Sequence, residues 1–179
     1  MKRSQTKTDG MGHKIKRRAY ANDVFITPRD LGLMHINATK KYVDDDAVWY
    51  DPFRHDEHGT YYSQFPTEKK EWAEITEERD FFTYNPGTIS VICSNPPYSI
   101  IDKVFEKSCS LKPNIISYII GVNNLTTRRL QKMNQQGYTL VYVKMLKVYK
   151  WFGMSFICIW ATKQPPNSDV IQYDRKVWR

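Results

Sequence analysis

The sequence predicts a single α/β domain with a mostly parallel sheet, helices on both faces and an antiparallel C-terminal strand. Apolar runs of strand length alternate with segments of helical periodicity, which is typical of parallel sheets covered on both sides. The chain has 179 residues, enough for one well-buried core and too few for two ordinary domains. The last two β-rich segments are joined by a short turn, which indicates an antiparallel strand added at the sheet edge.

Individual elements follow from local signals. A helix is expected from Thr27-Pro28 to about residue 42, because threonine can cap a helix and proline suits its first position. A strand over 47–50 stops at Asp51-Pro52, and a helix over 125–136 is expected to end at Gly137. The other expected strands are 70–75, 89–93, 115–120, 138–148 and 154–162, with a further helix over 99–110.

Composition divides the chain into a basic arm over 1–20, a folded domain over 21–163 and a tail over 164–179. The formal net charge is +8, and residues 103–179 carry thirteen Lys and Arg against three Asp and Glu. Residues 44–80 reverse this balance, with twelve acids against four bases. The basic parts are expected to attract polyanions, although a merely solvated basic surface explains the charge equally well.

Three widely spaced cysteines lack zinc-like spacing, so they are expected to be reduced, buried thiols. No stretch approaches the ~18 apolar residues of a membrane helix, and no apolar segment follows the charged N-terminus. We therefore expect an intracellular protein of the cytoplasm or nucleus, without a membrane partner. The neighbouring His55, Asp56, Glu57 and His58 are not expected to bind a metal, because adjacent loop residues seldom converge on one ion.

The most informative segment is Asn95-Pro96-Pro97-Tyr98, which follows a strongly apolar strand and precedes an amphipathic helix. The two prolines stiffen the backbone and keep Asn95 out of the helical region. The Asn95 side-chain oxygen and the Pro96 carbonyl can then accept both hydrogens of a planar amine, and Tyr98 offers a face for stacking. The same four residues also fit a rigid turn with a packed tyrosine, and the sequence alone leaves that interpretation open.

The segment resembles the catalytic motif of S-adenosylmethionine-dependent amino-methyltransferases, chiefly the DNA adenine enzymes, with glutamine and ribosomal-RNA enzymes sharing it. The resemblance covers most of residues 22–163 and is closest to small phage- and large-virus-type adenine methyltransferases, so a viral or phage protein is one expectation. It implies a Rossmann-like class I methyltransferase fold, S-adenosylmethionine as cofactor and no metal. The other segments that carry it are Phe25-Ile26-Thr27-Pro28, Asp51-Pro52-Phe53, Glu74-Ile75, Asp80-Phe81-Phe82 and Trp151-Phe152-Gly153.

Roles follow from the resemblance residue by residue. Asp51 is expected near the methionine portion, Glu74 at the ribose hydroxyls and Asp80 at the cofactor's adenine. The cofactor-binding set is Phe25, Thr27, Asp51, Phe53, Gly59, Glu74, Asp80 and Phe81. Catalysis is assigned to Asn95, Pro96 and Tyr98, and contact with the substrate to Pro97, Trp151, Phe152, Lys150 and Arg128.

The expected substrate is adenine in nucleic acid, with DNA favoured over RNA. No recognition domain is expected after residue 163 or between the catalytic turn and the final strands, so we expect little built-in sequence specificity or a protein partner that supplies it. The cations expected to hold phosphates without reading sequence are those of the basic arm together with Lys144, Lys147, Lys150, Arg128 and Arg129.

Two alternatives remain open at this stage. The loop after Asp51 has only Gly59 where family members carry two closely spaced glycines, so the chain also fits a catalytically inactive nucleic-acid-binding or scaffold relative. Methylation of a protein side-chain amide by the same turn is the other. In addition, the acids between Glu68 and Glu78 fit a solvated surface, and Trp151 and Phe152 fit the packed aromatics of a hairpin.

Overall fold

A computed structural model of the chain describes residues 25–55, 58–162 and 171–178. The expected basic arm over 1–20 lies outside the described residues. The helices are α2 (Arg29–Lys40), α3 (Ile101–Ser110) and α4 (Thr127–Gln135). The strands are β1 (Trp49–Asp51), β2 (Lys70–Trp72), β3 (Val91–Ser94), β4 (Ile115–Gly121), β5 (Thr139–Val148), β6 (Ser155–Ala161) and β7 (Ile171–Trp178). None of the described helices is long and apolar enough to span a bilayer.

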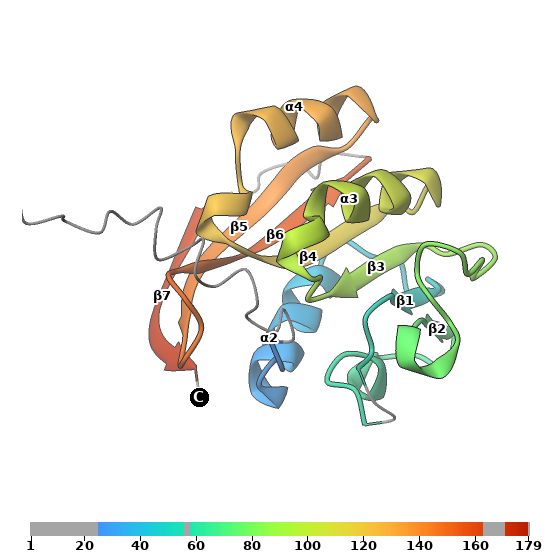
Figure 1. Cartoon of the computed structure of the whole chain (residues 1–179), viewed down its shortest axis with the longest axis horizontal. Helices are drawn as coiled ribbons and strands as arrows, with labels where there is room; N and C mark the ends of the chain where they lie inside the picture. Colours follow the sequence, from blue (N-terminus) through green and yellow to red (C-terminus); the bar gives the residue numbers. More distant parts are fainter. Residues whose placement is uncertain (1–24, 56–57, 163–170, 179) are drawn as a thin grey trace, which may run out of the picture.

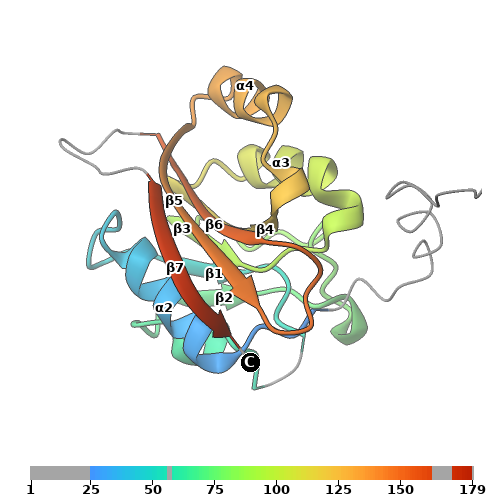
Figure 2. The same cartoon turned by 90° about the vertical axis from the view of Figure 1, so that its left-hand side faces the viewer.

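One seven-stranded sheet runs through the molecule in the order β2-β1-β3-β4-β6-β5-β7. β6 is antiparallel to both of its neighbours, and every other pairing is parallel. α3 and α4 cover one face of this sheet and α2 covers the other (Figures 1 and 2). The predicted Rossmann-like α/β fold, mostly parallel with an antiparallel C-terminal strand, is confirmed.

The strands between the two helical layers are apolar on both faces. In β3, Val91 and Cys93 pack into the cluster beneath α2, whereas Ile92 packs into the cluster beneath α3. Successive strand residues point to opposite faces, so a strand with a core on each side needs a continuous apolar run. The continuous apolar runs of the sequence located these strands for that reason.

Three elements differ from the sequence prediction. β6 does not lie at the sheet edge but fills the gap between β4 and β5. Pro28, expected as the first residue of the first helix, occupies its N-cap, with no side-chain cap. The sheet also continues beyond residue 163, because β7 pairs with β5 in parallel inside the segment expected to be a tail.

The sheet changes its direction of winding between β1 and β3. The chain passes from β1 outward to β2 and then crosses back over β1 to β3. In open parallel sheets, the crevice at the carboxyl ends of the strands beside such a switch point is the usual place for a ligand. Here Asp51 ends β1 and Ser94 ends β3.

Candidate active site at the switch point

A cavity of about 270 Å³ lies at this position. Four segments form its wall: the chain before α2 and the residues that follow β1, β2 and β3. Seven of the residues predicted from the sequence line it: Phe25, Thr27, Phe53, Gly59, Glu74, Asn95 and Pro97. The wall also includes Ile26, Arg54, His55, His58, Thr60 and Tyr61, which were not assigned a role.

Asp51 lies behind the cavity wall rather than in it. Its carboxylate is fully buried and accepts hydrogen bonds from the Ser94 hydroxyl (2.7 Å) and from the backbone amides of Phe53 and Tyr62 (3.3 Å each). Burial raises the pKa of this carboxyl to about 6, although the three donors oppose the shift. Asp51 therefore ties the ends of β1 and β3 to both ends of the following loop and sets its shape.

The backbone of the loop after β1 meets its conformational needs with Gly59 as its one glycine. His55 adopts a positive φ of 74°, the region where glycine is usual, and its exposed position leaves room for the side chain. On the inner side, Gly32 of α2 lets Thr60 approach so closely that an added Cβ would lie 2.3 Å from the Thr60 methyl carbon. The loop is therefore held by contacts with α2, which the spacing of its own residues does not reveal.

Glu74 follows β2 and is half-buried at the cavity. One carboxylate oxygen accepts from the Thr76 amide (3.1 Å) and hydroxyl (2.9 Å), and the other accepts from the His55 amide (2.8 Å). Each carboxylate oxygen can accept more than one hydrogen bond. The side chain is thus fixed in place and retains acceptor capacity toward the cavity.

Arg54 is a buried cation in the wall of the cavity. Its guanidinium pairs with Glu77 and lies 3.6 Å from the centre of the Trp72 ring. The guanidinium of Arg79 lies 3.9 Å from the centre of the same ring. Cations over an indole face are attracted by its ring electrons. The stack holds the loop against the edge strand β2.

Asn95 has a fixed orientation. Its side-chain nitrogen donates to the Phe25 carbonyl (2.9 Å), and its oxygen accepts from the Tyr98 hydroxyl (3.3 Å). The amide oxygen has two lone pairs, so one hydrogen bond from Tyr98 leaves it able to accept another. Pro97 lines the cavity next to it, while Pro96 is buried.

Three aromatic rings from distant parts of the sequence meet beside Asn95. Phe25 stacks on Tyr98 at a centroid distance of 6.0 Å with 25° between the ring planes, and it contacts Trp151 at 5.7 Å. Gly121 adjoins the edge of Tyr98, where an added Cβ would lie 3.4 Å from the ring. The structure therefore brings together Asn95, Tyr98 and Trp151, as the sequence predicted, with Phe25 between the two larger rings.

The β5–β6 turn that carries Trp151 is held by Lys147. The ammonium donates to the carbonyls of Trp151 (2.8 Å) and Gly153 (2.7 Å). Lys150 and Gly153 have positive φ values of 63° and 68°, so the backbone of the turn is sharply folded. Lys147 thus binds two carbonyls of this turn, and its expected contact with phosphate stays a prediction.

Replacing Lys147 with methionine is expected to lower the free energy of unfolding by about 1–3 kcal/mol, because both carbonyls lose a charged donor. Urea unfolding followed by circular dichroism measures this. Lys147→Arg retains donors and is the matched control, expected to lose less. A Lys147→Met protein as stable as the wild type would contradict the two hydrogen bonds.

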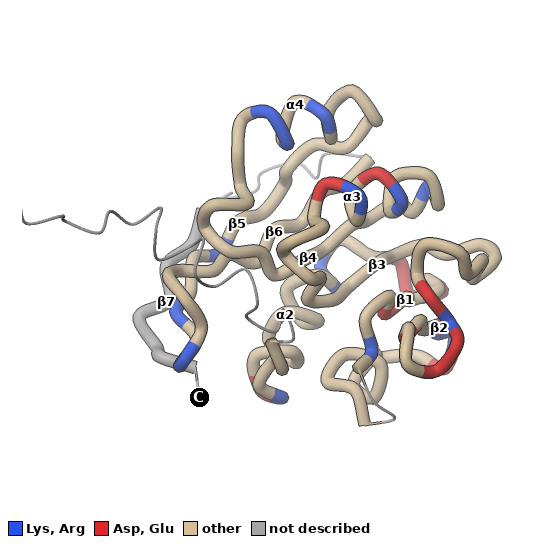
Figure 3. Tube along the Cα trace, in the orientation of Figure 1, with Lys and Arg blue, Asp and Glu red and all other residues tan. Residues whose placement is uncertain are grey.

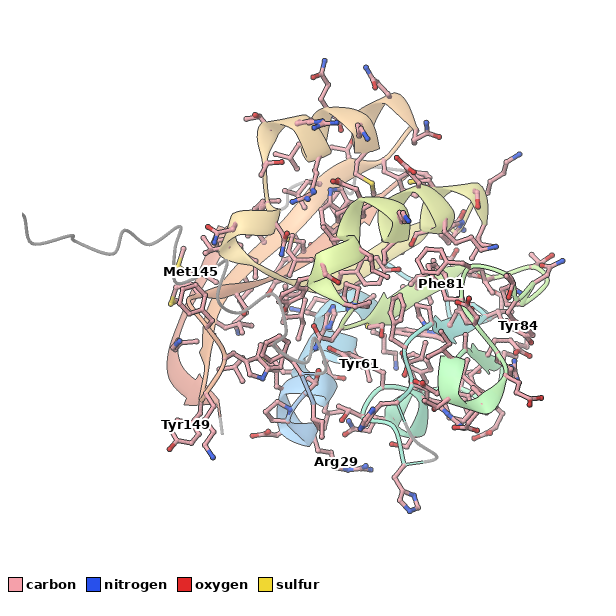
Figure 4. The ribbon with its side chains drawn as sticks, in the orientation of Figure 1. Arg29, Tyr61, Phe81, Tyr84, Met145 and Tyr149 are labelled. Carbon is pink, nitrogen blue, oxygen red and sulfur yellow. The ribbon has the colours of Figure 1, made fainter. Side chains whose placement is uncertain are left out.

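Several predicted residues lie apart from the cavity. Asp80 does not line it and instead accepts from the Phe82 amide at 3.0 Å. Phe81 is buried on the α3 side of the sheet, where it packs on Phe53 at 5.1 Å (Figure 4). Phe81 therefore supports the cavity wall from behind.

The two arginines predicted to hold phosphate lie on α4, in the layer opposite α2 (Figure 1). Arg128 is exposed there and does not line the cavity. Arg129 donates to both carboxylate oxygens of Asp102, at 2.8 and 3.2 Å. The guanidinium of Arg129 is thus engaged in an ion pair within the protein, and its expected contact with phosphate stays a prediction.

A buried polar network under α2 was missed by the sequence analysis. The His35 ring is fully buried, with one nitrogen 3.0 Å from the Tyr61 hydroxyl and the other 2.7 Å from the Ser117 hydroxyl. Burial lowers the pKa of His35 to about 3, so the ring is neutral at physiological pH. Because Tyr61 lines the cavity and Ser117 lies on β4, His35 connects the cavity wall to the centre of the sheet.

Among the described residues, no three His, Cys, Asp or Glu side chains are grouped so that they could hold a metal ion. The cavity instead combines carboxylate, amide and imidazole side chains with aromatic walls. Such a lining suits a polar organic ligand with a flat ring and hydroxyl groups.

Comparisons with known proteins identify no family. No protein-family model matches the sequence, and no curated protein sequence matches it. Among solved structures, a precorrin-6y C5,15-methyltransferase from Geobacter metallireducens is similar, with 11% identity and a TM-score of 0.47 over 74% of this chain and 86% of that chain. A protein assigned as a methyltransferase from Thermoplasma acidophilum has 9% identity and a TM-score of 0.44 over 83% and 68%. The case for a function therefore rests on the site's own residues.

Proposed function

We propose that this protein is an S-adenosylmethionine-dependent methyltransferase that acts on the exocyclic amino group of adenine in nucleic acid, with DNA favoured over RNA. One observation carries the proposal: a single cavity at the switch point joins the acid after β2, Glu74, to the amide after β3, Asn95. An acid after β2 suits the hydroxyls of a ribose, as in other nucleoside-binding sheets. An amide after β3 suits a planar amine, because its oxygen can accept a hydrogen bond from the amino group.

The residues present fit the cofactor. Glu74 offers carboxylate acceptors for ribose hydroxyls, Phe53 offers an aromatic wall, and Thr27 and Gly59 also line the cavity. Phe81 contributes through Phe53, and Asp51 contributes by shaping the loop. S-adenosylmethionine supplies a methyl group already activated by a sulfonium centre, so the protein needs neither a metal nor a covalent intermediate.

The chain's own part in the reaction is to hold and polarise the amine. The lone pair of an adenine amino group is delocalised into the ring, which makes the nitrogen a weak nucleophile. The amino group donates one hydrogen bond to the Asn95 oxygen and one to the Pro96 carbonyl, and this arrangement favours a tetrahedral nitrogen. The hydrogen bond from Asn95 to the Phe25 carbonyl presents the amide oxygen rather than its nitrogen.

The test begins with cofactor binding. Isothermal titration should detect S-adenosylmethionine binding, and Glu74→Gln should weaken it about 10- to 100-fold, because hydrogen bonds to a charged acceptor contribute roughly 1.5–3 kcal/mol. Glu106→Gln, on the exposed side of α3, is the matched control and should bind like the wild type. Failure of the wild-type protein to bind the cofactor would refute the proposal.

The alternative is a relative that binds nucleic acid without catalysis. The glycine-poor loop and the position of Asp80 outside the cavity favour it. Such a protein would bind nucleic acid in a salt-dependent manner and show no heat of cofactor binding. The titration above therefore separates the two.

A further inference from the structure

The β5–β6 turn displays two aromatic side chains to solvent on either side of a lysine. Tyr149 and Phe152 are 50% and 54% exposed, whereas Trp151 between them is only 8% exposed and contacts Phe25. The Lys150 ammonium lies 5.5 Å from the centre of the Tyr149 ring. Figure 4 shows Tyr149 directed away from the molecule at the end of β5. Tyr149, Lys150 and Phe152 are called the turn surface below.

The turn surface adjoins the proposed target pocket. Trp151, the buried residue between Lys150 and Phe152, contacts Phe25, and Phe25 in turn stacks on Tyr98. The Val122 amide donates to the Met154 carbonyl (2.9 Å), which places the 41% exposed Val122 side chain beside the same turn. A series of ring contacts from Trp151 through Phe25 to Tyr98 thus connects the turn to Asn95, where the amine would be held.

The stretch of sequence that contains the turn surface carries positive charge only. Residues 107–168 contain nine Lys and Arg and no Asp or Glu. Figure 3 shows most acidic residues around β2, at the opposite edge of the sheet, and on α3, away from the turn. A polyanion that approaches the turn therefore meets no nearby acid from β4, α4, β5 or β6.

We propose that the turn surface binds single-stranded nucleic acid, so that the bases flanking the target nucleotide stack on Tyr149 and Phe152 while Lys150 contacts phosphate. This inference rests on the proposed function for its target pocket. Exposed aromatic rings beside cations bind single strands without regard to sequence, because every unpaired base has a free face. Bases within a duplex have both faces covered by their neighbours and cannot use these rings. The substrate class favoured by the structure is therefore unpaired nucleic acid.

Fluorescence anisotropy tests the inference, with a labelled adenine-containing oligonucleotide compared as a single strand and as the matched duplex. We expect the full-length protein to bind the single strand at least about tenfold more tightly. The double variant Tyr149→Ala, Phe152→Ala should lose at least about tenfold for the single strand and little for the duplex, since stacking on one side chain contributes about 1–3 kcal/mol per base.

The control is the double variant Leu33→Ala, Ile75→Ala, which removes two other exposed apolar side chains, 44% and 70% exposed, and should bind like the wild type. Equal affinity for the two forms of nucleic acid, or equal losses in the two double variants, would overturn the inference. The assay contains no cofactor, so its result is separate from the titration of S-adenosylmethionine. A protein that prefers single strands but binds no cofactor would retain the turn surface and lose the proposed enzyme activity.

Discussion

Alanine in place of Asn95 should reduce methyl transfer to adenine by about 100- to 1000-fold, the usual effect of removing one polar group that stabilises a transition state. The substitution removes the only side-chain acceptor proposed for the target amine. It also leaves the Phe25 carbonyl and the Tyr98 hydroxyl without the partners that now align them. Transfer of a labelled methyl group to an oligonucleotide measures the loss.

The effect should fall on turnover, because Asn95 borders only one part of the cofactor cavity. Affinity for S-adenosylmethionine should change by no more than a few fold. Asn95→Asp retains an acceptor oxygen and should keep more activity than Asn95→Ala. Asn134→Ala, on the surface of α4, is the matched control. Full activity of Asn95→Ala would show that the amine is held elsewhere.

The sequence located the parts of the site that depend on local pattern. Mostly apolar runs identified β3 and β4, because a strand covered on both faces does not alternate between apolar and polar residues. The Asn95-Pro96-Pro97 segment was placed correctly at the end of β3, since two prolines cannot continue a ladder. Gly137, at a φ of 86°, ends the helical region of α4 as expected.

The parts that were missed depend on contacts between distant residues. The bond from Asn95 to Phe25 spans 70 residues and that from His35 to Ser117 spans 82. A histidine in an amphipathic helix carries no signal that its partner is a serine on a buried strand. Likewise, nothing local indicates that Gly32 faces Thr60, or that Lys147 turns toward carbonyls rather than toward solvent.

The order of the C-terminal strands was missed for a related reason. The turn after β5 predicts that β6 is antiparallel to it, and this is correct. It does not determine which side of β5 the returning strand takes. Between β4 and β5, the backbone of β6 forms hydrogen bonds along both of its edges, and the other edge of β5 pairs with β7. This arrangement is favoured because it satisfies more backbone groups than a position for β6 at the sheet edge.

Acid is expected to destabilise the protein through His35. The pKa of this ring is lowered from 6.5 to about 3, so the unfolded chain takes up a proton below pH 6.5 that the folded protein does not accept. The stability contributed by the neutral ring is fully present above pH 6.5 and is lost as the pH falls toward 3. At 1.36 kcal/mol per pH unit, the loss between pH 6.5 and pH 4.5 is about 3 kcal/mol.

Urea unfolding at pH 7.5 and pH 4.5 measures this loss, and His35→Gln isolates it. Glutamine does not titrate and can still bond with the Tyr61 and Ser117 hydroxyls, so the variant should lose about 3 kcal/mol less than the wild type over the same interval. Asp51 acts in the opposite sense. Its raised pKa of about 6 means that acid relieves the cost of its buried charge, but this contribution is common to both proteins and cancels in the difference. The same pH dependence in both proteins would mean that His35 is hydrated in solution, and the wall formed by Tyr61 would then lack the rigid support that a fixed cofactor cavity needs.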